Sequence, residues 1–260
     1  MQQGILMVSF GSSHKETREK NIDGIFSHVR EKYPKAKCYQ AFSSDMIRKI
    51  LKTRDFIEIP DIEGALIEMK KDGITHAYIQ PTHIIDGIEN NKMKEIAGKF
   101  SGEFQVLKIG SPLLDTKEDF DETVKGIWEE LTPIVRDDIL ILMGHGTTHE
   151  ANEAYSRLEA CFRSHGKNKV YIATVEGTPT IEDVMDKLTC RKGERIVLAP
   201  FMFVAGEHAV NDMAGEEDSF SSKLSAAGYI TDCILKGIGE YEPIRDRYIK
   251  HLDEILTKAE

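Results

Sequence analysis

The chain has 260 residues, a formal net charge of −10, 40% hydrophobic residues and 30% charged residues. This length can bury a large core, and the acidic balance argues against a nucleic-acid-binding protein, which would present a basic face. No run approaches the roughly 20 apolar residues that a membrane helix needs, and the first apolar run, 5–10, lacks the basic flank of a signal peptide. We therefore expect a cytoplasmic protein that acts on neither nucleic acid nor membrane.

The four cysteines, Cys38, Cys161, Cys190 and Cys233, form no Cys-x-x-Cys pair. This spacing argues against a zinc site built from paired thiolates. Scattered single cysteines are typical of free thiols in a reducing compartment.

The first half of the chain alternates apolar runs with amphipathic stretches. Near-continuous apolar runs are typical of parallel strands that are buried on both faces, and alternation with helices predicts βαβ units. The expected strands cover 5–10, 37–42, 75–80 and 104–109. The expected helices lie around 22–29, 46–51 and 62–69, and 82–91 is a loop or the beginning of a helix.

The second half repeats this plan. Gly11-Ser12-Ser13-His14 resembles Gly146-Thr147-Thr148-His149, and Pro81 precedes Gly87 by the same interval that separates Pro200 from Gly206. We therefore predict two similar α/β halves, 1–120 and 121–260, each a parallel sheet flanked by helices, with a cleft between them. The C-terminal amphipathic helix, 243–258, could cross back to the first half.

Three apolar runs of the second half each deliver a polar residue. His145 follows the run 139–144, Glu176 follows 170–175, and His208 follows a run from 196 that extends to 204. The steps between them are 176 − 145 = 31 and 208 − 176 = 32 residues, and a βαβ unit takes about 30. Because parallel strands end at one sheet edge, these side chains are expected to lie together.

Two imidazoles and one carboxylate suit zinc, cobalt, nickel or iron(II). Three protein ligands also leave coordination positions open, as in catalytic rather than structural sites. A lone histidine is usually a surface residue, so the prediction depends on all three coinciding. Glu207 is a rival ligand, and its side chain should point elsewhere if His208 points inward.

Helix signals flank this predicted site. His149 lies four residues after His145, but Gly146 interrupts any shared helix, so we expect Thr147 or Thr148 to cap a helix with His149 in its first turn. Thr178 is expected to be another N-cap, with Pro179 at the first helical position.

Four stretches carry a resemblance that covers essentially the whole chain. They are Met143-Gly144-His145-Gly146-Thr147, Thr174-Val175-Glu176-Gly177, the run from Pro200 to His208, and Val8-Ser9-Phe10-Gly11-Ser12-Ser13. On these residues the chain resembles the class II chelatases, in particular those that insert cobalt into sirohydrochlorin in the anaerobic cobalamin pathway.

The resemblance implies two flavodoxin-like halves with a tetrapyrrole cleft between them. It implies that His145, Glu176 and His208 are the metal ligands and that His145 also accepts a pyrrole proton. The partners would be sirohydrochlorin and a divalent metal. No cofactor is expected beyond the substrate ion, Co²⁺, with Fe²⁺, Ni²⁺ or Zn²⁺ as substitutes in vitro. The sequence leaves a homo-oligomer open.

Matching the two halves position by position suggests where the tetrapyrrole would lie. Phe10 falls opposite His145, Ser44 opposite Glu176, and Glu89 opposite His208. The metal ligands are therefore complete only in the second half, and the first half would contact the tetrapyrrole. The candidates for substrate binding are Phe10 and Met202 on the ring face, with Ser12, Ser13, Ser44 and Glu89 at its polar groups.

Several other functions fit part of the pattern. The same fold could insert iron(II) or nickel(II), because the ligands do not choose sharply among these ions. A carrier of metal or tetrapyrrole would bind without turnover. A zinc-dependent hydrolase would need a nucleophile motif, which we do not find, and a periplasmic-type binding protein would need an export signal.

Overall fold

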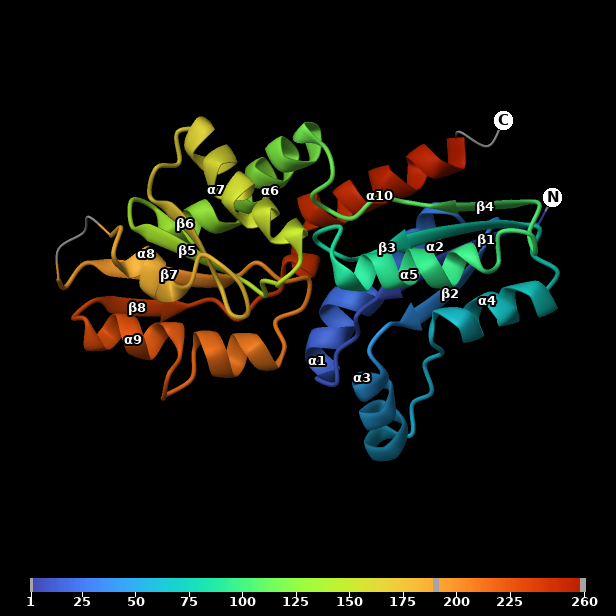
Figure 1. The fold of residues 1–260 in the computed structure, drawn as a ribbon, viewed down its shortest axis with the longest axis horizontal. Helices are drawn as coiled ribbons and strands as arrows, with labels where there is room; N and C mark the ends of the chain where they lie inside the picture. The colour runs from blue at the N-terminus through green and yellow to red at the C-terminus, as the bar shows by residue number, and fades with distance from the viewer. Residues whose placement is uncertain (1, 189–191, 258–260) are drawn as a thin grey trace. The chain divides into compact units, whose positions relative to one another are not determined.

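The computed structural model describes residues 2–188 and 192–257, and these form two compact units. The first unit contains residues 2–115 and 245–257, and the second contains the described residues of 116–244. Each unit has its own four-stranded parallel sheet with helices packed against it (Figure 1). Within the described ranges, no helix has both the length and the apolar character needed to cross a membrane.

The first unit is built on a sheet with the strand order β2-β1-β3-β4. Its two central strands are buried along almost their whole length, as the continuous apolar runs predicted. The strands are β1 (Gln3–Ser9), β2 (Lys37–Phe42), β3 (His76–Pro81) and β4 (Val106–Ile109). The helices are α1 (Lys15–Thr17), α2 (Gly24–Lys32), α3 (Asp45–Ile50), α4 (Ile62–Lys71) and α5 (Ile88–Gly98), with π-helical turns η1 (Arg18–Asp23) and η2 (Leu51–Asp55).

The second unit has the same topology, with the strand order β6-β5-β7-β8. Its strands are β5 (Ile139–Gly144), β6 (Val170–Thr174), β7 (Arg195–Pro200) and β8 (Ile230–Cys233). Its helices are α6 (Lys117–Val135), α7 (Glu153–Ser164), α8 (Ile181–Met185) and α9 (Phe220–Ala226), with short turns η3 (Glu150–Asn152), η4 (Ala209–Met213) and η5 (Ile238–Glu240).

The last helix, α10 (Glu242–Thr257), begins in the second unit, and its residues 245–257 belong to the first. Tyr248 of this helix is fully buried, and its hydroxyl donates to the carbonyl oxygens of Thr82 and His83 at 3.0 and 3.2 Å. The side chain of Asp253 accepts a hydrogen bond from the Tyr33 hydroxyl at 2.6 Å. The C-terminal segment therefore completes the core of the first unit.

The prediction of two similar α/β halves is confirmed, and the repeat extends to single hydrogen bonds. The Phe10 carbonyl accepts from the Ser44 amide at 3.2 Å, and the His145 carbonyl accepts from the Glu176 amide at 2.8 Å. The predicted cleft stays a prediction.

Some boundaries differ from the expected ones. The strand expected over 196–204 ends at Pro200, and the strand expected from 104 begins at Val106. The C-terminal helix begins at Glu242 and is described as far as Thr257, and residue 258 lies outside the described residues. Strand β8 has no counterpart in the prediction, because it alternates exposed and half-buried residues and lacks a continuous apolar run.

Candidate metal centre

The segments that follow β5, β6 and β7 of the second unit bring His145, Glu176 and His208 together. One potential ligand atom of each lies within 4.8 Å of the corresponding atoms of the other two. His145 Nδ1 lies 3.8 Å from Glu176 Oε2, and the two imidazole rings meet at right angles with their centroids 4.7 Å apart. The expected proximity of these side chains is present in the fold, and all three remain partly open to solvent.

The loop that carries His145 depends on glycine. Gly146 has φ +81°, and a Cβ at this position would lie 2.5 Å from the Gly177 amide nitrogen. A side chain is therefore excluded both by the backbone conformation and by the close approach of the two loops. Glycine at this position therefore allows the loops carrying His145 and Glu176 to approach each other closely.

Asn152 connects the same two loops. Its Oδ1 accepts from the Thr147 amide at 3.0 Å, and its Nδ2 donates to the Thr178 carbonyl at 2.6 Å. One side chain thus satisfies a backbone donor of the His145 loop and a backbone acceptor of the Glu176 loop. This role of Asn152 could not be predicted from the sequence, because its two backbone partners come close only in the folded chain.

His208 is oriented by a carboxylate one helical turn away. Its Nδ1 lies 2.6 Å from Asp212 Oδ2, so the imidazole donates through Nδ1 and keeps the Nε2 lone pair available for an ion. Carboxylate partners of this kind commonly fix the tautomer and the ring orientation of metal-binding histidines. Asp212 was also missed, although the four-residue spacing from His208 could have indicated it.

The rival residues have other partners. Glu207 accepts a hydrogen bond from Asn211 Nδ2 at 2.9 Å, and the cluster of donor atoms contains His208 rather than Glu207. His149 is itself the N-cap of η3, because its Nδ1 accepts from the Ala151 amide at 3.1 Å. The prediction that a threonine caps this helix is therefore wrong, and the Thr147 hydroxyl accepts from the His149 amide instead.

The helix expected to begin at Pro179 is a second correction. The Pro179 carbonyl accepts from the Thr174 amide at 2.7 Å, so this residue still belongs to the turn that follows β6. Thr180 is the N-cap of α8, with a reciprocal bond to Asp183, and the helix begins at Ile181.

The residues predicted to contact a tetrapyrrole lie in different environments. Phe10 is 47% exposed, whereas Met202 is buried in the apolar core of the second unit. The buried Ser12 and Ser44 hydroxyls accept from the amides of His14 and Ile47 at 3.2 and 3.3 Å.

Two further candidates lie in the first unit. Ser13 is half-buried, and its carbonyl accepts from the Arg54 side chain. Glu89 lies in the first turn of α5, and its buried Oε2 has no hydrogen-bond partner among the described residues. Contact of these residues with a tetrapyrrole stays a prediction.

Comparison with known proteins gives a consistent result over the whole length. Residues 3–257 match the family model described as cobalt chelatase (CbiK). The chain is 32% identical over 260 residues to the sirohydrochlorin cobaltochelatase of Salmonella typhimurium, covering 100% of this chain and 98% of that protein. It is 31% identical over 262 residues to the sirohydrochlorin cobaltochelatase CbiKC of Nitratidesulfovibrio vulgaris, covering 98% and 91% of the two chains.

Among solved structures, the chain is similar to the sirohydrochlorin chelatase SirB from Bacillus subtilis subspecies spizizenii in complex with cobalt. The TM-score is 0.68 at 14% identity, with 100% of this chain and 97% of that chain covered. This likeness supports the assignment of the fold.

Proposed function

The chain belongs to the cobalt chelatase family, and on that premise we propose that it inserts Co²⁺ into sirohydrochlorin, with release of two protons, in anaerobic cobalamin biosynthesis. The observation that supports the proposal is the cluster of His145, Glu176 and His208 at one sheet edge. We further propose that the reaction takes place in the cytoplasm.

A chelatase must hold its metal ion and then give it up. Two imidazoles and one carboxylate suit a borderline ion such as Co²⁺, and three protein ligands leave positions for water and for incoming ring nitrogens. The side chains of His145, Glu176 and His208 are 44%, 60% and 38% exposed, so a large flat substrate can reach the ion. An open, incomplete ligand set favours transfer over permanent storage.

We propose that His145, besides binding the metal, also accepts a proton from a pyrrole nitrogen. Metal insertion requires two pyrrole nitrogens to lose their protons, and an imidazole is suited to accept one near neutral pH. His145 Nδ1 lies 3.0 Å from the Gly146 carbonyl oxygen, and a hydrogen bond donated there leaves Nε2 for either the ion or the proton. Nε2 can therefore accept a pyrrole proton as the ion passes from His145 to the unprotonated ring nitrogens, and the second pyrrole proton goes to solvent.

For the tetrapyrrole we keep the contacts that the repeat suggested, and Glu89 has the strongest support. A buried carboxylate oxygen without a partner among the described residues is costly unless a ligand supplies a donor. The pyrrole N–H groups of the substrate are donors of the required kind. The exposed ring of Phe10 is suited to contact the macrocycle face.

The proposal is tested by anaerobic absorption spectroscopy of sirohydrochlorin with Co²⁺, after subtraction of spontaneous insertion. We expect the chain to accelerate the spectral change, and His145→Ala or His208→Ala to remove that acceleration while the fold is kept. Glu207→Gln is the matched control, because Glu207 neighbours His208 but has a different partner.

Two results would change the proposal. Faster insertion of Fe²⁺ or Ni²⁺ than of Co²⁺ under the same conditions would reassign the metal. A spectral change from binding alone, without added rate for any of the three ions, would contradict an enzyme and indicate a carrier.

A further inference from the structure

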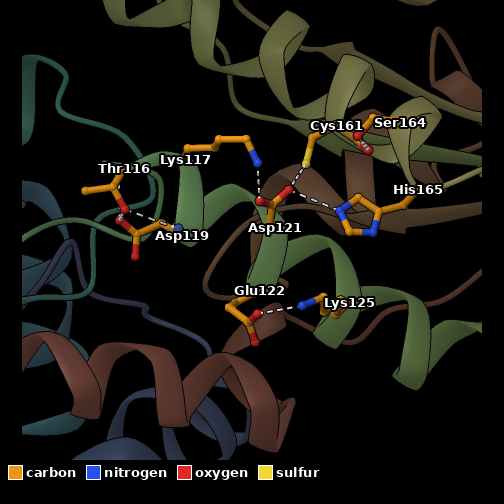
Figure 2. A network of polar contacts seen from close by, with 9 residues as sticks. All are labelled: Thr116, Lys117, Asp119, Asp121, Glu122, Lys125, Cys161, Ser164 and His165. Atoms are coloured by element: carbon orange, nitrogen blue, oxygen red, sulfur yellow. Dashed lines mark hydrogen bonds and ion pairs between the residues drawn. The ribbon is translucent and has the colours of Figure 1, made fainter.

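A second group of ligand-type side chains lies between α6 and α7, and none of its members belongs to the centre described above. Asp121 of α6 faces Cys161 of α7 and His165, the residue at the C-terminal cap of α7 (Figure 2). Asp121 Oδ1 lies 3.4 Å from Cys161 Sγ and 3.1 Å from His165 Nε2. The donor atoms of all three lie within 4.8 Å of one another.

We propose that Asp121, Cys161 and His165 form a second binding site for a divalent transition-metal ion, with Zn²⁺ or Co²⁺ as the matching ions. The site offers one sulfur, one nitrogen and one oxygen donor, a set that suits these ions and disfavours Mg²⁺ and Ca²⁺. The proposal does not depend on the function assigned to the first centre.

The spacing of the donors supports the proposal. Zinc binds sulfur at about 2.3 Å, imidazole nitrogen at about 2.0–2.1 Å and carboxylate oxygen at about 2.0–2.2 Å, so tetrahedral ligands lie about 3.3–3.6 Å apart. In the structure Asp121 Oδ1 lies 3.4 Å from Cys161 Sγ and 3.1 Å from His165 Nε2, close to these values. An ion can therefore replace the present hydrogen bonds with small side-chain movements.

The secondary structure explains how the three residues meet. Cys161 and His165 are separated by four residues, which places their side chains on one face of α7. His165 also lies at the end of this helix, where the helix dipole favours a positive charge. Asp121 comes from the neighbouring helix, so the ion would join α6 to α7.

The ion pair between Lys117 and Asp121 leaves one carboxylate oxygen of Asp121 for the ion. Lys117 Nζ binds Asp121 Oδ2 at 2.6 Å, and Oδ1 faces the thiol and the imidazole. The Lys117 side chain is 89% exposed, so it can move away into solvent. Solvent also reaches the site, because the side chains of His165 and Asp121 are 29% and 25% exposed.

Binding at this site releases a proton from the thiol. Burial and the neighbouring Asp121 raise the pKa of Cys161 to about 11, so the free protein carries S–H at neutral pH. When the metal–sulfur bond forms, this proton passes to the solvent, and the hydrogen bond to Asp121 is replaced by the metal. Three protein ligands and one water then complete a tetrahedron.

The test uses the full chain with His145→Ala and His208→Ala, which disable the first centre. Co²⁺ is added to this reduced protein under anaerobic conditions, and the near-ultraviolet sulfur-to-cobalt charge-transfer band is followed. We expect the band to saturate at one ion per chain. It should disappear in Cys161→Ser, and in His165→Ala the affinity should fall about tenfold or more.

Cys38→Ser is the matched control, because Cys38 is also half-buried and its thiol donates to the Ala36 carbonyl. A band that is absent from the starting protein, or one that persists in Cys161→Ser, would overturn the proposal. A second experiment needs no cysteine variant, so it still tests the proposal if Cys161→Ser fails to fold. In the unsubstituted chain, Zn²⁺ should slow alkylation of Cys161 and leave that of Cys38 unchanged, and equal rates with and without Zn²⁺ would also overturn it.

Discussion

The two histidines of the first centre each have a hydrogen-bond acceptor beside Nδ1. Nδ1 of His208 faces Asp212, and Nδ1 of His145 faces the Gly146 carbonyl. A donor bond from Nδ1 fixes the tautomer and leaves Nε2 as a ligand. The chemistry of the site therefore depends on residues that would not touch the metal.

At this scale we predict that Asp212→Ala weakens Co²⁺ binding about tenfold or more, the usual effect of removing a carboxylate behind a metal-binding histidine. The KM for Co²⁺ should rise by a similar factor, with a smaller change in kcat. Asp212→Asn should restore part of the loss, because its carbonyl oxygen still accepts from Nδ1. Unchanged binding in Asp212→Ala would mean that packing alone orients His208.

His83 gives a second prediction for a single residue, through pH. Its Nδ1 lies 3.1 Å from Asn90 Oδ1, and its buried Nε2 has no hydrogen-bond partner within the described part of the chain. Burial lowers the pKa of His83 below its ordinary 6.5. Below pH 6.5 the unfolded chain therefore binds a proton at His83 more readily than the folded protein does. The free energy of unfolding is not affected by His83 above this pH and decreases as the pH falls below it.

The measurement is urea unfolding at a series of pH values on either side of 6.5, the ordinary pKa of His83. His83→Gln keeps a donor for Asn90 and cannot be protonated, so the decline should be shallower than in the unsubstituted chain. Parallel curves for the two proteins would show that another group controls the acid sensitivity.

At the scale of elements, the loops after β5 and β6 are the parts that hold the first centre. They are joined by the two hydrogen bonds of Asn152, and the absence of a side chain at Gly146 lets them approach closely. The strands supply the correct edge of the sheet, and these contacts supply the final position of His145 relative to Glu176.

We predict that Asn152→Ala destabilises the protein by about 0.5–1.5 kcal/mol, because it removes the hydrogen bonds to the Thr147 amide and the Thr178 carbonyl, which water can partly replace at this solvent-accessible position. Chelatase activity should fall while the ligands themselves are unchanged. Thermal unfolding and the insertion rate measure the two effects. Asn168→Ala, in the turn before β6, is the control, and an equal loss of activity there would contradict the assigned role.

The strands and helices differ in how well the sequence predicted them. Strands such as β5 were predicted because burial on both faces requires a continuous apolar run. The edge strand β8 was missed because its exposed positions interrupt that run. The helix beginnings near 147 and 179 were wrong because threonine caps depend on the path of the chain, which long-range contacts of these loops decide.

At the scale of the whole molecule, the candidate centre could be predicted because residues that follow successive parallel strands lie close together in the fold. Parallel strands joined by helices end at one edge, so the segments carrying His145, Glu176 and His208 all leave the sheet on the same side, and the loop contacts then set their final positions. The group of Asp121, Cys161 and His165 could not be predicted in this way. Its members come from helices separated by β5, and only the packing of α6 against α7 brings them together.

Residues 245–257 contribute to the core of the first unit, so their removal should act on that unit first. Tyr248, Ile249 and Leu252 are buried, and each contributes about 2–3 kcal/mol by burial, against about 5–15 kcal/mol for a whole domain. We predict that a chain ending at Ile244 loses the structure of 2–115 and keeps that of the second unit. Hydrogen exchange would show this directly.

Co²⁺ binding at the first centre should survive the same truncation, because all three ligands belong to the second unit. Insertion into sirohydrochlorin should be lost. Loss of protection in both units together would show instead that they unfold as one cooperative body.

The matching hydrogen bonds after β1 and β5 make the first unit suitable for the design of a second metal site. The backbone that presents Phe10 and Ser44 repeats the backbone that presents His145 and Glu176. Grafting histidine at Phe10, glutamate at Ser44 and histidine at Glu89 should therefore create a twin of the natural centre with three substitutions. Such a variant would show whether the repeated backbone is sufficient to build a second metal site.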